Sequence, residues 1–487
     1  MEIIMGSILI GIFLVMMILM YLNKISALLA LPIMAIAFTI VAGIPNIPWQ
    51  DINSKYAAAK VESVTISQQW QAYAQVEQQK GNMIGVITAK WAAFKAKFNP
   101  WFYLRDTLAG SNLLKVVLYE GSLRLHEAYT LAFFGGMLAI FVRKKGIAEA
   151  VIRVAAELAG DKPIIVSTVL LLVCALLFIT LGGLGAIIMI GSIIFPIMLS
   201  LGVPAHVAAG VMLIGLCTGG SLNPQAWVFY KDALGVPTDV TGGFAVKMAL
   251  LYLAIGIVYI IINVKFGSMG RYWAAPAPSD NEAAPARKIN FLGILTPLIP
   301  LFLILVLGWS PFPSFIGGLI WGLIFTWEKN QVKIFSQSLF EGAESVMPAV
   351  LLMIGIGMLL KAVTLPEVSM YLKPLLEGII PTTPIAYIVT FTLFAPLALY
   401  RGPLNVWGMG SGLAGIMLAT GKLPPQAIMA MLVSVGAIQG VCDPTNTHNV
   451  WIAGYLGIDV ISITKKLIAY IWVLAMFGLV IAAYSYL

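Results

Sequence analysis

Four short segments combine glycine or proline with amide, hydroxyl or charged side chains inside otherwise apolar sequence. They are residues 181–185, 218–224, 400–405 and 439–449. Glycine lets a ligand approach the backbone closely, and proline interrupts the hydrogen bonding of a helix. The free N–H groups of a half-helix attract anions, and its free carbonyl groups can coordinate Na⁺. The four segments therefore predict helix breaks that bind small ions.

Side-chain type and position within these segments predict two sets of ligands. Breaks at matching places in two halves of a chain are typical of the sites of secondary transporters. The residues expected to contact an anionic substrate are Gly183, Ser221, Asn223, Arg401, Asn405, Asn446 and Thr447. The residues expected to contact a coupling cation are Gly219, Asn223, Asp443 and Thr445.

The charged residues of these segments leave alternatives open. Arg401 lies amid apolar sequence, where a charge needs a partner. That partner is an anionic substrate, a protein carboxylate or water at the outer face. Asp443 could bind Na⁺, carry a coupling proton or cap the following half-helix. His448 could titrate near neutral pH or make a structural hydrogen bond, and helix-start capping accounts for Glu120 and Glu341.

The composition requires a membrane. Hydrophobic residues make up 60% of the 487 residues and charged residues only 10%, whereas a soluble domain has about 25% charged residues. The net charge of +8 reflects lysine and arginine in cytoplasmic loops rather than nucleic-acid binding. The sequence has no H-E-x-x-H zinc motif and no C-x-x-C pair among its three cysteines. We therefore expect neither an enzyme nor a metal site, and no cofactor beyond Na⁺ or H⁺ as coupling ion.

Runs long enough to span a bilayer alternate with interrupted apolar runs. We expect the first run to be a retained span rather than a signal peptide. Two segments, 146–160 and 332–346, have helical amphipathic spacing and are expected to lie flat on the membrane. The expected spans are 3–22, 26–43, 127–142, 244–265, 291–308, 314–328, 346–363 and 467–486.

The chain also contains an internal repeat. Similar motifs recur in the same order at a nearly constant separation. With five crossings in each half, an odd number, the second half must enter from the opposite face, which makes the repeats inverted. The matching pairs include Glu120 with Glu341, Gly121 with Gly342, Gly136 with Gly357, Pro204 with Pro424, Asn223 with Asp443 and Leu234 with Leu456.

The predicted fold class is therefore an all-α integral membrane protein with about 10 transmembrane helices and two re-entrant hairpins in two inverted repeats. The positive-inside rule places both termini outside the cytoplasm. The predicted divisions are leading spans of the first repeat (1–44), a polar extracytoplasmic insert (45–112), the first transport core (113–266, with hairpin 163–201 and broken helix 205–230), a cytoplasmic linker (267–289), leading spans of the second repeat (290–330) and the second transport core (331–487, with hairpin 383–420 and broken helix 426–454).

This architecture resembles the ion transporter superfamily, over nearly the whole chain except 45–112. Divalent-anion carriers of that group bind substrate and Na⁺ with Ser-Asn-Thr motifs, whose nearest counterparts here are residues 221–224 and 445–447. Neither segment is an intact Ser-Asn-Thr triplet, and the first hairpin tip has only glycines. Within the superfamily, the citrate and gluconate branches are the most similar to this chain. The resemblance implies a homodimeric, elevator-type transporter of small organic anions, coupled to Na⁺ or H⁺, in a bacterial-type inner membrane. The alternative is a Na⁺/H⁺ antiporter of the same fold.

Overall fold

The computed structural model describes residues 2–22, 24–43, 49–97, 115–265 and 290–487. The linker expected at 267–289 lies outside these residues, as do the two ends of the expected insert. Within them the chain is helical and contains no β-strand. Among the described residues, seven helices are long and apolar enough to cross a bilayer, and the number rises to nine if each of two bent pairs is one span. The expected class, an all-α integral membrane protein, is confirmed.

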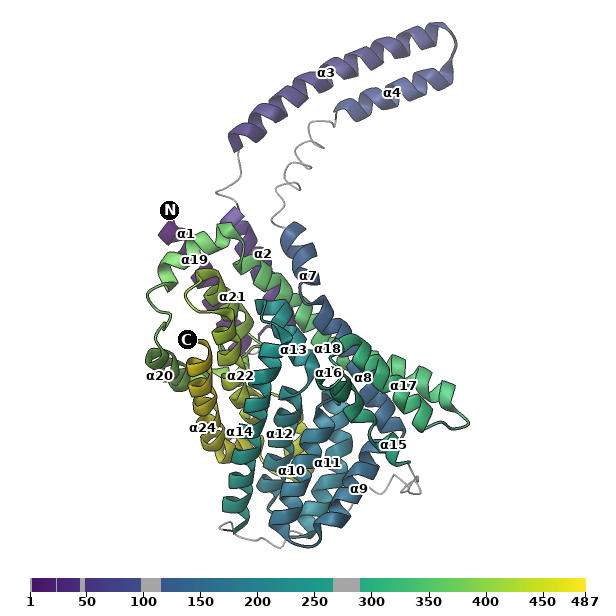
Figure 1. Cartoon of the computed structure of the whole chain (residues 1–487). Helices are drawn as coiled ribbons and strands as arrows, with labels where there is room; N and C mark the ends of the chain where they lie inside the picture. Colours follow the sequence, from purple (N-terminus) through teal and green to yellow (C-terminus); the bar gives the residue numbers. More distant parts are fainter. Residues whose placement is uncertain (1, 23, 44–48, 98–114, 266–289) are drawn as a thin grey trace.

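The helices of the first half begin with the hairpin of α1 and α2 (Figure 1). A polar hairpin of α3 and α4 follows before the remaining helices. The bounds are α1 (Glu2–Tyr21), α2 (Ala27–Gly43), α3 (Trp49–Gln79), α4 (Met83–Lys97), η2 (Val116–Glu120), α7 (Gly121–Leu123), α8 (His126–Lys144), α9 (Ile147–Ala159), α10 (Pro163–Phe178), α11 (Gly183–Ser200), α12 (Ala205–Ser221), α13 (Pro224–Leu234) and α14 (Thr238–Lys265).

The second half follows the same order without a polar hairpin. Its bounds are α15 (Phe291–Ile294), η3 (Thr296–Leu298), α16 (Ile299–Leu305), α17 (Pro311–Phe325), α18 (Gln331–Val363), α19 (Pro366–Leu376), α20 (Pro384–Phe394), η4 (Ala395–Arg401), α21 (Gly410–Thr420), α22 (Pro425–Cys442), α23 (Thr447–Leu456) and α24 (Val460–Tyr486).

Proline and glycine define where many of these helices start and stop. Pro163, Pro224 and Pro425 occupy the first turns of α10, α13 and α22, where the missing N–H group costs no helical hydrogen bond. Gly235 and Gly457 end α13 and α23 in the left-handed conformation that favours glycine. The breaks are therefore local properties of the sequence.

One expected surface helix is part of a longer element. Residues 332–346 belong to α18, a continuous helix of 33 residues that includes Pro348. The expectation of a separate amphipathic helix there was wrong, because this stretch packs along α8, where Gly342 meets Gly136 and Glu341 pairs with Lys144, and the helix continues through it. Residues 146–160 do form a separate helix, α9, whose first residue follows the left-handed Gly146.

The centre of the molecule is a close antiparallel crossing of α7 and α8 with α18. A Cβ atom added to Gly136 would lie 2.6 Å from the carbonyl oxygen of Gly342, and one added to Gly121 would lie 2.8 Å from Cα of Met358. Glu120 pairs with Lys361 at 2.7 Å at one end of the crossing. Glu341 pairs with Lys144 at 2.7 Å at the other. The repeated glutamates thus link the two halves, whereas the sequence suggested helix-start capping.

Helices α14 and α24 are a second antiparallel pair between the halves. Lys247 donates a hydrogen bond to Ser485 (3.4 Å), and Asn263 donates one to Tyr470 (3.1 Å). The order of the contacts is reversed between the two helices, since the later residue of α14 meets the earlier residue of α24. Both central helix pairs therefore join matching elements of the two halves in opposite directions.

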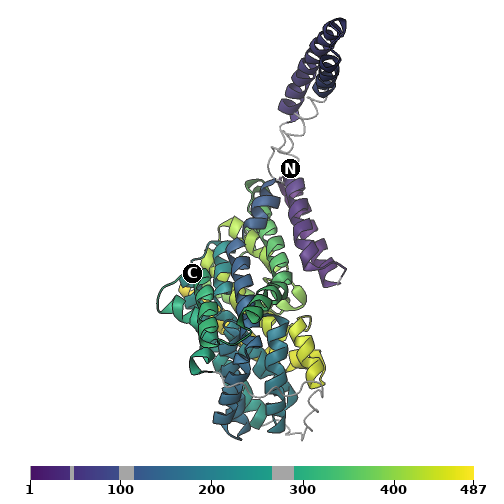
Figure 2. The ribbon, with the colours of Figure 1, turned by 90° about the vertical axis from the view of Figure 1, so that its right-hand side faces the viewer.

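Helices α3 and α4 form a hairpin that extends from the end of the bundle where the N-terminus lies (Figures 1 and 2). Their contact is lined by small residues, with Ser67, Ala89 and Ala93 buried. At the turn, hydrogen bonds from Lys80 (3.1 Å) and Asn82 (2.7 Å) lower the pKa of the Glu77 carboxyl. This hairpin lies within the sequence predicted to form the polar insert.

Candidate functional site

The two broken helices approach one another close to their breaks. Helix α12 ends at Ser221 and α13 begins at Pro224, with a bend of 57° between them. Helix α22 ends at Cys442 and α23 begins at Thr447. A Cβ atom added to Gly440 would lie 2.7 Å from the Sγ atom of Cys217, so the last turns of α12 and α22 are in contact. The breaks of the two halves are therefore neighbours in the interior.

Each hairpin packs against the broken helix of the opposite half. The ring of Phe229 on α13 lies 5.0 Å from that of Trp407, in the loop of the second hairpin. The ring of Trp451 on α23 lies 6.2 Å from that of Phe195 on α11, in the first hairpin. These aromatic contacts position the hairpins beside the breaks.

The second break is closed by side chains. The last four carbonyl groups of a helix have no partner within the helix, and in α22 each of the four accepts a hydrogen bond from a side chain. The side chains of Asn446, His448, Asn449 and Thr464 are the donors. They donate to the backbone carbonyls of Gln439 (2.7 Å), Gly440 (3.1 Å), Val441 (3.0 Å) and Cys442 (2.7 Å), respectively. The polar residues after Asp443 thus hold the end of α22, and the ring of His448 has a structural partner.

The first break is closed mainly by the backbone. The amide N–H groups of Leu222 and Asn223 donate to the carbonyl groups of Gly219 (3.0 Å) and Gly220 (3.3 Å). The Ser221 hydroxyl donates to Thr218 (2.7 Å), and the indole of Trp227 donates to the Ser221 carbonyl (2.9 Å). The carbonyl groups of both breaks are therefore already engaged, which restricts the coordination of a cation to their second lone pairs and to side-chain oxygens.

The tip of the second hairpin has a strained backbone. Tyr400 and Arg401 have φ angles of 55° and 58°, a region that costs energy for residues other than glycine. A Cβ atom added to Gly408 would lie 2.5 Å from the Arg401 carbonyl oxygen, so the loop folds back tightly on this residue. Asn405, which is fully buried, donates to the Ala398 carbonyl (3.2 Å) and accepts from Trp407 N (2.9 Å).

This tip contacts the second break through Asp443. The backbone N–H of Arg401 donates to Oδ2 of Asp443 at 3.4 Å, while the Arg401 guanidinium donates through Nη1 to the Trp407 carbonyl at 3.3 Å. Oδ1 of the fully buried Asp443 accepts from the amide (2.9 Å) and hydroxyl (2.7 Å) of Thr445. The carboxylate therefore organises the turn after α22 and ties it to the hairpin.

The two downstream half-helices start differently. Asn223 caps α13 by accepting from the amide of Gln225 at 2.9 Å. Asn446 occupies the same place before α23, but its side chain makes no cap hydrogen bond there and turns back to Gln439 instead. The first-turn N–H groups of α23, which begin at the exposed Thr447, carry the partial positive charge of a helix N-terminus.

The first hairpin tip is exposed and lies beside α18 rather than at the second break. Gly183 has a φ of +80°, and its nearest outside neighbour is the carbonyl oxygen of Ser345 on α18, 3.8 Å from an added Cβ. An added Cβ at Gly185 would lie 3.0 Å from a guanidinium nitrogen of Arg143. Contacts join Arg401, Asn405, Asp443, Thr445 and Asn446 around the second break, whereas Gly219, Ser221 and Asn223 belong to the first break and Gly183 faces the central helix.

Three residues of the second break were missing from the sequence-based site. Gln439 donates a hydrogen bond to Asn446 across the break, and Asn449 donates one back to the Val441 carbonyl. Thr464, on α24, donates one to the Cys442 carbonyl. Oδ1 of the fully buried Asn449 has no hydrogen-bond partner among the described residues. Gln439 and Asn449 lie inside the motif and could have been included on side-chain type. Thr464 lies in a later span, and no sequence signal connects it to the break.

The hydrogen bond of Thr464 gives a test of this closure. Replacing Thr464 by valine keeps its shape but leaves the Cys442 carbonyl without that donor. We expect the free energy of unfolding to fall by roughly 1–3 kcal/mol, measured as a lower Tm of the purified protein in detergent. Thr464→Ser retains the hydroxyl and is the control, expected to lose less than half as much; equal losses would contradict the capping role.

Comparison with known proteins gives similarity at the level of the fold. No family model and no curated protein sequence matches the chain. The structure is similar to that of the Alcanivorax borkumensis YdaH transporter, with a TM-score of 0.54 and 12% identity over 78% of this chain and 87% of that one. It is also similar to Neisseria gonorrhoeae MtrF, described as illuminating a class of antimetabolite efflux pumps, with a TM-score of 0.55 and 12% identity over 77% of this chain and 85% of that one. The chain has the fold of these membrane transporters.

Proposed function

We propose that the chain is a secondary active transporter of small organic anions of the citrate, gluconate or dicarboxylate class, coupled to Na⁺ or H⁺. The observation that carries the proposal is the contact of the strained Arg401 tip with the buried break at Asp443. Strain of this kind persists at functional sites because the surrounding structure compensates for it. The contact joins a re-entrant hairpin to a helix break, which is the arrangement that binds substrate in many secondary transporters.

The charge of this region favours an anion. The Trp407 contact occupies one terminal nitrogen of the Arg401 guanidinium, a group with five N–H donors that suit a carboxylate. The start of α23 adds N–H groups that the Asn446 side chain does not cap. A carboxylate between the guanidinium and this helix start would gain hydrogen bonds and favourable electrostatics from both.

A coupling cation would use oxygen atoms of the same break. Asp443 supplies a buried negative charge, and Asn449 Oδ1 is a buried acceptor without a described donor. A buried oxygen of this kind usually has a water molecule or an ion as its partner. We propose that these two residues, with Thr445 and the first-break residues Gly219 and Asn223, form the cation site.

We further propose that the two halves are inverted repeats. A two-fold axis along the membrane normal leaves matching helices parallel, whereas an axis in the membrane plane makes them antiparallel. Matching helices are antiparallel in both central pairs, where Gly136 meets Gly342 and Lys247 meets Ser485. The repeat order of the sequence supports the same relation. As in the ion transporter superfamily, the proposal includes a homodimer, an elevator-type movement, a bacterial-type inner membrane and extracytoplasmic termini.

Counterflow in proteoliposomes tests the transport function. Vesicles preloaded with unlabelled citrate, gluconate or a C4-dicarboxylate should accumulate the same labelled acid, and an inward Na⁺ or H⁺ gradient should drive uptake. Because MtrF is described as belonging to a class of efflux pumps, the assay should also measure release of labelled acid. Protein-free vesicles are the control.

The same vesicles distinguish the antiporter alternative. A pH-sensitive dye trapped inside reports proton movement when a Na⁺ gradient is imposed. Accumulation of none of the acids, together with Na⁺-driven changes of internal pH, would replace the anion transporter by a Na⁺/H⁺ antiporter. The buried Asp443 would then be the carboxylate expected to carry the ion.

A further inference from the structure

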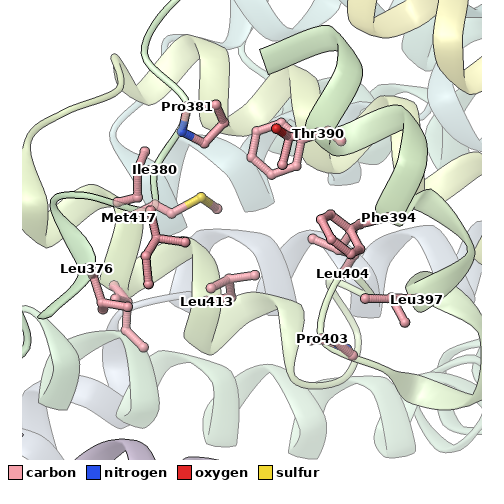
Figure 3. A pocket seen from close by; sticks show the side chains of 13 residues that line it. Leu376, Ile380, Pro381, Thr390, Phe394, Leu397, Pro403, Leu404, Leu413 and Met417 are labelled. Atoms are coloured by element: carbon pink, nitrogen blue, oxygen red, sulfur yellow. The ribbon is translucent and has the colours of Figure 1, made fainter. Parts of the chain in front are cut away.

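A cavity lies between the two arms of the hairpin that presents Arg401. It has a volume of 290 Å³ and is bounded by α20, α21 and the segment after α19 (Figure 3). Leu376 and Met417 lie at one end in this view, and Leu397 and Pro403 lie at the other. The cavity thus runs from the α19 end of the hairpin to the loop that follows Arg401.

The apolar side chains that line the cavity favour a hydrocarbon ligand. Thr390 is the one polar residue among the 13 that line the cavity, and the polar surface is negligible. Water remains in a cavity when it finds two to four polar partners, and an apolar cavity of about 150 Å³ stays dry and takes up benzene. A cavity of 290 Å³ therefore has room for a longer apolar group than a single benzene ring.

The cavity opens to the outside of the helix bundle. Ile379, Phe394 and Leu397 line it and are 74%, 48% and 47% exposed. These side chains belong to or adjoin a membrane-embedded hairpin, where the surrounding medium is lipid. The hydrocarbon at highest local concentration is therefore the acyl chain of a phospholipid.

Two lysines lie next to the α19 end of the cavity. Lys373 precedes the lining residue Leu376 by one helical turn on α19, and Lys422 follows the lining residue Met417 just beyond the end of α21. The two helix ends are joined by a hydrogen bond from the Ser369 hydroxyl to the Ala419 carbonyl (3.3 Å). Both lysines are exposed, and Lys373 also lies 3.7 Å from the Glu377 carboxylate, an exposed pair that water screens. Lysine side chains extend to the membrane surface and attract phosphate.

We propose that this cavity binds one acyl chain of an anionic phospholipid, whose phosphate interacts with Lys373 and Lys422. Lipid binding does not depend on the proposed transport function. It does affect the tip, because Pro403 and Leu404 line the cavity and follow Arg401 by two and three residues. An acyl chain between the arms would support the strained loop that contacts Asp443.

Native mass spectrometry of the full-length protein, delipidated in mild detergent and titrated with phosphatidylglycerol, tests this site. We expect one tight lipid adduct. Leu413→Trp fills the cavity and should remove this adduct, whereas Ile320→Trp, on the exposed face of α17, should retain it. The double variant K373Q/K422Q should weaken binding at least tenfold, with K329Q/K333Q as the charge-matched control. A thermal unfolding scan of each variant checks that it folds.

Three outcomes would overturn the proposal. Leu413→Trp could fold and retain the tight lipid adduct. Phosphatidylcholine and phosphatidylglycerol could bind equally well and be unaffected by the lysine replacements. The protein could form dimers that Leu413→Trp dissociates without any change in lipid binding, in which case a second copy of the chain covers the cavity.

Discussion

Replacing Arg401 by glycine is expected to reduce organic-anion transport by roughly 30-fold or more while leaving the protein at least as stable. The loss of a charged hydrogen-bonding partner for a buried carboxylate costs about 2–5 kcal/mol, and about 1.4 kcal/mol corresponds to a factor of ten. Glycine adopts a φ of 58° without strain, which offsets the lost hydrogen bond to Trp407. Initial rates of uptake in proteoliposomes measure the change.

Two variants separate charge from backbone conformation. Arg401→Lys keeps the positive charge at the same strained position and should retain partial transport, because lysine lacks the planar pair of donors. Arg153→Ala removes an exposed charge from α9 and should transport normally. If Arg401→Gly transported at the wild-type rate with an unchanged KM, the guanidinium would have no part in substrate binding.

Replacing Gly342 by alanine is expected to destabilise the central helix crossing and to lower transport with it. An added Cβ would lie 2.5 Å from the backbone N and Cα atoms of Met137, so neither helix can relieve the clash by rotating a side chain. Overpacking of this kind costs roughly 1–3 kcal/mol. The expected result is a lower Tm in detergent and a smaller yield of monodisperse protein.

A second glycine provides a matched control for this substitution. Gly436 lies inside α22 with no atom within 4 Å of an added Cβ. Gly436→Ala should therefore raise the free energy of unfolding by up to about 1 kcal/mol, because alanine is the better helix former. If both variants had the same Tm, close contact between the two halves at Gly342 would be ruled out.

The sequence alone contains the information for the membrane class and for the helix breaks. Both depend on local physical properties: long apolar runs require a bilayer, and proline at Pro224 or Pro425 interrupts helical hydrogen bonding wherever it occurs. The repeated Glu120-Gly121 and Glu341-Gly342 pairs marked residues of structural importance. Their role was misread as capping, because an ion pair such as Glu341 with Lys144 depends on which helices cross.

The candidate site also combines residues that a local sequence pattern identifies with contacts that only the packing of distant helices creates. The polar residues at 443–449 are visible in the sequence, and in the structure three of them, Asn446, His448 and Asn449, donate hydrogen bonds to the end of α22. Thr464 joins them from another span, which no local pattern can indicate. Sequence composition determined that this chain lies in a membrane with interrupted helices. Only the tertiary structure decided that Arg401 meets Asp443 and that Gly136 meets Gly342, because these contacts join residues far apart in the chain through the packing of whole helices.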